Sequence, residues 1–100
     1  MTTSRCDVAR AMLEDIVAEW SDWPGELQAI TGFEFAEYRA LKLKLDDPSS
    51  ELTETDADMM REGAKQFFGY PGMTTSGVER SLGPEWLSEV ESAFLNEDDR

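Results

Sequence analysis

The clearest hydrophobic pattern lies near the start of the chain, from Arg5 to Asp22. Apolar residues recur there every three or four positions, a spacing that gathers side chains on one face of an α-helix. Ser4 precedes this stretch and Asp7 follows Ser4 by three positions, which resembles a capping box. The pattern predicts an amphipathic helix whose apolar face carries Val8, Ala9, Met12, Leu13, Ile16, Val17 and Trp20.

The opposite face of this predicted helix is acidic. We expect its five carboxylates to be exposed and free to meet a partner, because they point away from the apolar face. Trp23-Pro24-Gly25 should end the helix, since proline disfavours a helical residue before it and glycine permits a turn. The five acidic residues are Asp7, Glu14, Asp15, Glu19 and Asp22.

The stretch from Gly32 to about Leu45 carries two competing patterns. Thr31 stands three positions before Glu34 and could cap a helix, which its alanines and lysines also favour. Leu41 to Leu45 instead alternates with period two, as a half-buried strand would. We predict a helix that is apolar nearly all round and therefore central in the fold. A hairpin over residues 33–45 remains the alternative.

The rest of the chain also predicts helices separated by turns. After a possible short helical turn at residues 26–30, the loop Asp46 to Ser50 precedes a helix that Thr53 or Thr55 caps and Gly69 ends. A short helix starts at Ser76, and Gly83-Pro84 opens a last one. Leu52, Met59, Met60, Gly63, Ala64 and Phe67 should be buried by the long helix, and Trp86, Leu87, Val90, Ala93 and Phe94 by the last.

These elements predict one all-α domain over residues 1–100, with four to five short helices and a frayed tail at residues 96–100. If residues 33–45 formed a hairpin, the fold would be α+β instead. With 40% of its residues apolar, a chain of 100 residues can build one modest core.

Charge changes the picture more than any motif does. The chain has 22 Asp and Glu, 9 Lys and Arg and no His, so its formal net charge is -13. From Ala11 to Tyr38 there are seven acids and no base, and from Asp46 to Met60 six acids and no base. Such a chain repels a polyanion, so direct binding of nucleic acid is not expected.

The residues needed for common enzyme mechanisms are missing. Without histidine, a Ser-His-Asp or Cys-His arrangement is excluded, and so is the commonest metal ligand. No phosphate-binding glycine motif occurs. An EF-hand frame fails because Leu52 stands where the loop needs glycine. The four residues that fit the calcium frame are Asp47, Ser49, Glu51 and Asp58. We therefore expect no enzyme, no catalytic residue, no cofactor and no metal.

The chain shows no signal for a membrane or for secretion. No segment approaches the about 20 apolar residues that span a bilayer, and the N-terminus has no signal-peptide pattern. The lone Cys6 has no partner for an internal disulfide, which fits a reducing compartment. We expect a cytoplasmic protein without a membrane partner.

The acidic residues themselves are the remaining functional signal. One interpretation is a solvated surface that provides solubility or adaptation to high salt. The other is a negative surface that captures a basic protein, because carboxylates at positions i and i+4 of a helix lie about 6 Å apart, on the scale of backbone phosphates. The candidate contacts are Glu14, Asp15, Glu19, Asp22, Glu26, Asp46, Asp47, Glu51 and Glu54, with Trp23 as an aromatic anchor.

In size, acidity and tryptophan-containing helical pattern, with acidic stretches Glu14 to Asp22 and Asp46 to Asp58, the chain resembles the small phage-encoded anti-CRISPR proteins. That group shares no sequence signature, so no residue is assigned by motif. The resemblance implies a compact, non-enzymatic inhibitor that covers the nucleic-acid-binding surface of a CRISPR effector complex.

Two alternatives use other partners. An immunity protein that neutralises a basic nuclease would use the same electrostatics. A small adaptor or phage assembly protein would instead dock through apolar side chains, with the acids keeping it soluble. Its contacts would be Trp20, Trp23, Phe68 and Tyr70.

Overall fold

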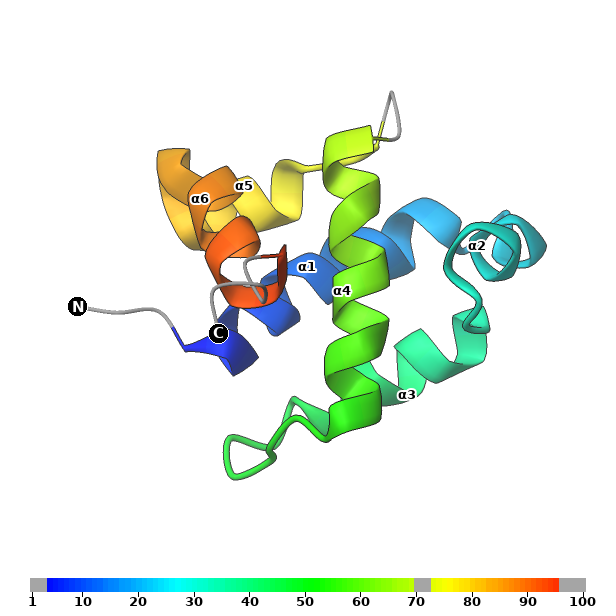
Figure 1. The fold of residues 1–100 in the computed structure, drawn as a ribbon, viewed down its shortest axis with the longest axis horizontal. Coiled ribbons are helices and arrows are strands. Elements are labelled where there is room, and N and C mark those ends of the chain that lie inside the picture. Colours follow the sequence, from blue (N-terminus) through cyan, green and yellow to red (C-terminus); the bar gives the residue numbers. More distant parts are fainter. Residues whose placement is uncertain (1–3, 70–72, 96–100) are drawn as a thin grey trace.

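The structure, a computed structural model, describes residues 4–69 and 73–95 as a set of packed helices (Figure 1). Within these residues there is no strand, which confirms the all-α prediction. The predicted frayed tail and Tyr70 lie outside the described residues. The elements are α1 (Arg5–Trp20), α2 (Pro24–Thr31), α3 (Phe35–Lys44), α4 (Glu54–Gly69), α5 (Ser76–Leu82), the 3-10 turn η1 (Gly83–Glu85), α6 (Trp86–Val90) and the π-helical turn η2 (Glu91–Leu95).

Helix α4 lies across α1, with α2 and α3 on one side of this crossing and α5 and α6 on the other (Figure 1). The two long helices approach closely at Gly63, where an added Cβ would stand 2.9 Å from Cδ1 of Ile16. One hydrophobic cluster runs through the crossing, from Val8 of α1 to Phe94 of η2. Tyr38 of α3 is fully buried in it, and its hydroxyl donates a hydrogen bond to the carbonyl of Met59 at 2.8 Å.

Helix α1 forms as its apolar pattern predicts. The Ser4 hydroxyl accepts a hydrogen bond from the Asp7 amide at 3.1 Å, so the predicted N-terminal cap is present. The helix ends at Trp20, two residues earlier than expected. The residues of its predicted apolar face are buried except Val17, which is half-buried.

The prediction that Thr31 caps α3 is wrong. The Thr31 hydroxyl donates to the carbonyl of Leu27 at 2.8 Å and accepts from the amide of Phe33 at 3.1 Å, so it belongs to the end of α2. Gly32, with φ of 83°, ends α2 in the left-handed conformation that glycine adopts without strain. Helix α3 begins only after Glu34, whose amide donates to the Glu37 carboxylate at 2.9 Å.

Helix α3 is a helix over the predicted stretch, so the hairpin alternative is wrong. The expectation that α3 lies at the centre of the fold is also wrong. Tyr38 and Leu41 face the core, whereas Ala36 and Ala40 are exposed and Leu43 is 68% exposed. Exposing an alanine side chain to water costs little free energy, so the side of α3 that carries Ala36 and Ala40 faces solvent and the helix lies at the edge of the fold.

The C-terminal half follows its predicted starts and stops. Thr53 and Asp56 form a reciprocal cap on α4, because the amide of each donates to the side chain of the other at 3.1 and 3.0 Å. The predicted buried stripe of α4 is present except for Leu52, which precedes the helix and is half-buried. In the last helix, Val90 is buried but Leu87 is 44% exposed, so the prediction that Leu87 is buried is wrong.

Candidate functional site

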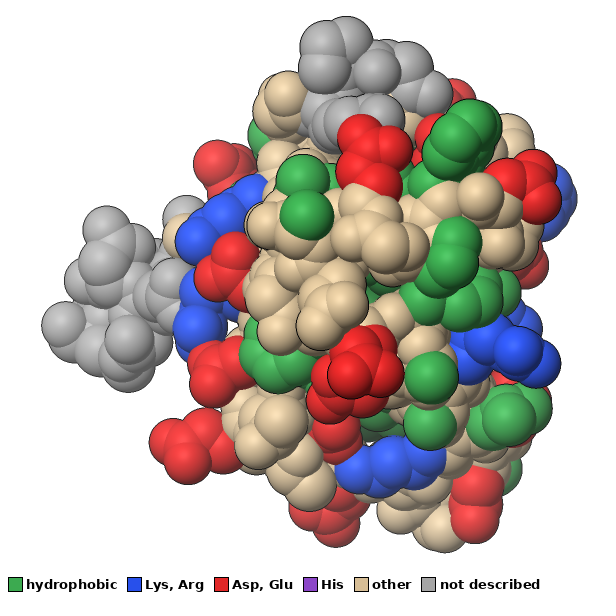
Figure 2. All heavy atoms as spheres, turned by 90° about the vertical axis from the view of Figure 1, so that its right-hand side faces the viewer, with side chains coloured by type: hydrophobic (Ala, Val, Ile, Leu, Met, Phe, Trp, Pro, Cys, Tyr) green, Lys and Arg blue, Asp and Glu red, His purple; other side chains and the backbone are tan. Residues whose placement is uncertain are grey.

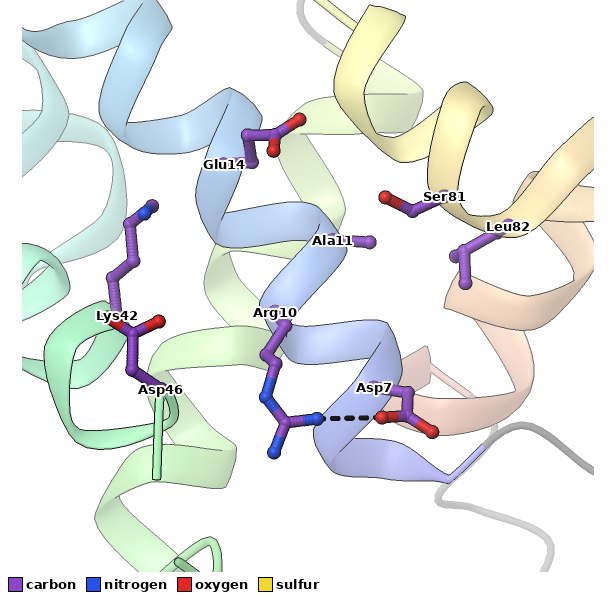
Figure 3. A pocket seen from close by; sticks show the side chains of 8 residues that line it. All are labelled: Asp7, Arg10, Ala11, Glu14, Lys42, Asp46, Ser81 and Leu82. Carbon is purple, nitrogen blue, oxygen red and sulfur yellow. Dashed lines mark hydrogen bonds and ion pairs between the residues drawn. The ribbon is translucent and has the colours of Figure 1, made fainter. Parts of the chain in front are cut away.

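A groove of about 560 Å³ crosses α1. One wall comes from α3 and the residue after its cap, and the other from the end of α5 (Figure 3). Ala11, only 4% exposed, forms part of its floor. The lining is mostly charged and consists of Asp7, Arg10, Ala11, Glu14, Lys42, Asp46, Ser81 and Leu82.

The spacing of residues along α1 explains the charged floor. Positions 7, 10, 11 and 14 follow the i, i+3, i+4, i+7 row of a helix, so they share one face. Arg10 donates from Nη1 to Asp7 at 2.7 Å and from Nε to the carbonyl of Leu45 at 2.5 Å. The Arg10 charge is thus held against Asp7, and its side chain ties α1 to the end of α3.

The groove brings together one carboxylate from each of the two predicted acidic stretches. Glu14 lies on α1 and Asp46 follows α3, and both are exposed. Glu14 also pairs with Arg80 of α5 at 2.5 Å. No ion pair is found for Asp46 among the described residues, so its carboxylate is available at the groove wall.

The expectation that Asp15 is exposed is wrong. It is 2% exposed, and its carboxylate accepts hydrogen bonds from the amides of Gly77 and Val78 at 2.9 and 2.8 Å. Burial raises the pKa of Asp15, and these two hydrogen bonds oppose that rise. Asp15 therefore caps the N-terminus of α5 and cannot contact a partner.

Glu19 is also used inside the molecule. Its carboxylate accepts from the hydroxyl of Thr74 at 2.6 Å and from the Thr74 amide at 3.2 Å, and the side chain is half-buried. Together with Asp15 and Glu14 it forms the polar surface against which the segment 74–80 packs. Of the five predicted acids, Asp15 and Glu19 are thus used inside the molecule, whereas Asp7, Glu14 and Asp22 are exposed.

The corner between α1 and α2 holds three other predicted contacts. Asp22, Trp23 and Glu26 are all exposed, and Trp23 is 62% exposed. Trp20, three residues earlier, is 1% exposed and belongs to the core. Of the two tryptophans at the end of α1, only Trp23 is accessible to a partner.

The loop between α3 and α4 and the first residue of α4 hold the remaining predicted contacts, and all of them are exposed. The Asp47 carboxylate accepts from the amide and the hydroxyl of Ser49 at 2.9 and 2.8 Å, and these hydrogen bonds lower its pKa. The thiol of Cys6 donates to the carbonyl of Ser50 at 3.7 Å, which holds the loop beside the first turn of α1. We call this segment the acidic loop; its carboxylates, named the loop carboxylates below, are those of Asp46, Asp47, Glu51 and of Glu54 at the start of α4.

The rejected calcium frame is occupied by other interactions. Asp47 forms the turn with Ser49, and Asp58 pairs with Arg61 at 2.7 Å. Among residues 4–69 and 73–95, no group of three or more His, Cys, Asp or Glu side chains is placed to hold a metal ion.

Sequence reasoning found only Glu14 and Asp46 among the residues that line the groove. The other six, which were not among the candidate contacts, are Asp7, Arg10, Ala11, Lys42, Ser81 and Leu82. The helical row from Asp7 to Glu14 could have shown that these side chains share a face with Glu14. The approach of α3 and α5 to that face has no signal in the sequence.

Comparison with known proteins found no relative of this chain. No protein family, no curated protein and no solved structure matches this chain. Within the part of the chain that the structure describes, none of the helices combines the length and the apolar character needed to cross a membrane.

Proposed function

We propose that this chain is a non-enzymatic acidic inhibitor that binds a basic, nucleic-acid-binding surface of a protein partner, such as a CRISPR effector complex, and keeps nucleic acid from it. The observation that carries this proposal is a set of exposed carboxylates at the groove and in the chain segment that follows it. Asp7, Glu14 and Asp46 line the groove, Asp47 and Glu51 follow in the α3–α4 loop, and Glu54 begins α4.

The balance of charges supports a basic partner. Among the described residues, five cations form ion pairs with acids of the chain itself, and none of these acids is a loop carboxylate. Lys44, the base nearest the loop in sequence, pairs with Asp56 at 2.5 Å. The loop carboxylates thus keep their charge for a partner and attract lysine or arginine side chains.

The test measures whether the chain displaces nucleic acid from a purified CRISPR effector ribonucleoprotein. Binding of the effector to a fluorescently labelled target duplex is followed by anisotropy while the chain is titrated in, at low and high salt. We expect inhibition that weakens as salt is added, because contacts between exposed charges are screened.

A pair of matched variants separates location from net charge. One carries three lysines in the acidic loop, and the other carries three lysines at exposed glutamates on α5, η1 and η2. Both change the net charge equally, so only the loop variant should lose inhibition. Equal loss in both would show that net charge alone acts, and full inhibition by both would refute the proposed site. The variants are Asp46→Lys, Glu51→Lys, Glu54→Lys and Glu79→Lys, Glu85→Lys, Glu91→Lys.

A second candidate function is a small adaptor or phage assembly protein with an apolar interface. Four large hydrophobic side chains that are 44 to 68% exposed favour it: Trp23, Leu43, Phe68 and Leu87. These four residues lie on different elements. On the face formed by α2 and α3, the hydrophobic side chains form small separate groups among charged ones (Figure 2). An adaptor complex would persist at high salt and would be lost in Trp23→Ala.

An immunity protein for a basic nuclease would use the same carboxylates. Replacing the effector by a purified basic nuclease in the same titration distinguishes it, because protection would then appear as loss of nuclease activity.

A further inference from the structure

The corner between α1 and α2 presents a tryptophan on a backbone that is hydrogen-bonded to both helices. The Trp23 amide donates to the carbonyl of Trp20 at 3.1 Å, and the Trp23 carbonyl accepts from Glu26 and Leu27 at 3.1 and 3.3 Å. Pro24 fixes the first residue of α2. The backbone at Trp23 is therefore held by both helices, while its side chain is 62% exposed.

The electrostatics of this corner favour a cation. The C-terminus of a helix carries a partial negative charge, which Lys or Arg in the last turn usually offsets. Helix α1 has no base in its last turn, and Asp22, just beyond its end, is exposed. The N-terminus of α2 carries the opposite partial charge, but Glu26 in its first turn counteracts it.

We propose that the Trp23 corner binds the guanidinium of an arginine on a basic protein. The planar cation stacks on the indole face while its N–H groups donate to the carboxylate of Asp22. Lysine fits less well, because its ammonium is compact, strongly hydrated and cannot stack. The chain uses a related contact internally, since Cζ of Arg5 lies 5.0 Å from the centroid of the Phe94 ring.

This inference rests on the proposed function for its class of partner, a basic protein, and it names the side chain that is recognised. It also separates two surfaces. The groove and loop attract either lysine or arginine by charge, whereas the corner selects arginine by shape and stacking.

The test titrates the full chain with an arginine-rich peptide and with a lysine-rich peptide of the same length and charge. Binding is followed by the indole N–H resonances in NMR spectra, with Trp23 assigned from Trp23→Phe. We expect the Trp23 resonance to shift with the arginine peptide, and the lysine peptide to bind about fivefold more weakly. An unmoved Trp23 resonance, or equal binding of the two peptides, would overturn the inference.

Variants identify the cause of the preference. Trp23→Phe should keep the preference for arginine because the ring remains, and Trp23→Leu should lose it. Asp22→Asn should weaken the arginine peptide, whereas the matched control Asp46→Asn in the groove should keep the preference. A Trp23→Leu protein that still prefers arginine contradicts stacking. Far-UV circular dichroism checks that each variant keeps its helices.

Failure of this inference can be told from failure of the proposed function. If the loop reversal abolishes displacement of nucleic acid while Trp23→Leu leaves the peptide preference unchanged, the function stands and the corner inference falls. If Trp23 selects arginine but the chain never displaces nucleic acid, the corner inference stands and the proposed function falls.

Discussion

Replacing Asp15 with alanine tests whether the acidic face of α1 is structural. The carboxylate is 2% exposed and accepts the amides of Gly77 and Val78, the first free N–H groups of α5. In the alanine variant these two donors stay buried without an acceptor as long as α5 remains packed on α1. The variant therefore removes a helix cap that comes from 62 residues away in the sequence.

The expected loss follows from these contacts. A buried donor left without an acceptor costs about 1–3 kcal/mol, and loss of an N-terminal cap costs about 0.5–2 kcal/mol. The two figures describe overlapping effects, and removing the carboxylate also ends its desolvation, the main reason its pKa is raised. We expect the free energy of unfolding to fall by about 2–4 kcal/mol, a large share of the about 5–15 kcal/mol typical of a domain.

Urea unfolding followed by far-UV circular dichroism measures this loss. Asp15→Asn keeps one carbonyl oxygen as acceptor and should lose less than the alanine variant. Glu14→Ala removes the neighbouring surface pair with Arg80 and should cost at most about 1 kcal/mol. If Asp15→Ala stays within about 0.5 kcal/mol of the unmodified chain, Asp15 does not hold α5 and the reasoning is refuted.

Three further predictions concern packing, pH and salt. Gly77→Ala places a Cβ 2.7 Å from Oδ1 of Asp15 and should lower the free energy of unfolding by about 1–3 kcal/mol. The control Gly25→Ala has open space around its Cβ and should leave this free energy unchanged. Urea unfolding compares the two variants, and equal stability would contradict the close contact at Gly77. Burial raises the pKa of Asp56, but hydrogen bonds from Lys44 and Thr53 outweigh burial and hold this pKa below its usual value. The stabilisation by the Asp56 carboxylate is therefore present above the unfolded pKa of about 3.8 and is lost as pH falls below it. Asp56→Asn should thus lose less stability than the unmodified chain in a pH series of urea melts, and parallel curves would rule this out. The net charge of -13 opposes compaction, so the urea midpoint should rise from low to moderate NaCl concentration, and a falling midpoint would count against self-repulsion.

Local signals in the sequence were enough to predict the two long helices, α1 and α4. The apolar rows of α1 and α4 and the caps at Ser4 and Thr53 involve residues within one or two helical turns of each other. Such contacts depend on the order of nearby side chains and on helix geometry, which the sequence contains directly.

Where local signals competed or left a choice open, the sequence alone did not decide the outcome. Thr31 could cap a helix by its spacing to Glu34, yet Gly32 ended α2 there and Glu34 took the position before α3. The apolar character of α3 could not show which of its sides would be covered, and Leu43 ended up in solvent.

The sequence by itself determined that this protein is helical, strongly acidic and without the histidine that common active sites use. Only the tertiary structure decided which acids are accessible. Asp15 caps α5 and Glu19 holds Thr74, whereas Glu14 and Asp46 meet at one groove although 32 residues separate them. The physical reason is that, where two helices pack together, a carboxylate on one is stabilised more by hydrogen bonds from the free N–H groups of the other than by water. Whether such a carboxylate meets those N–H groups depends on the positions of both helices.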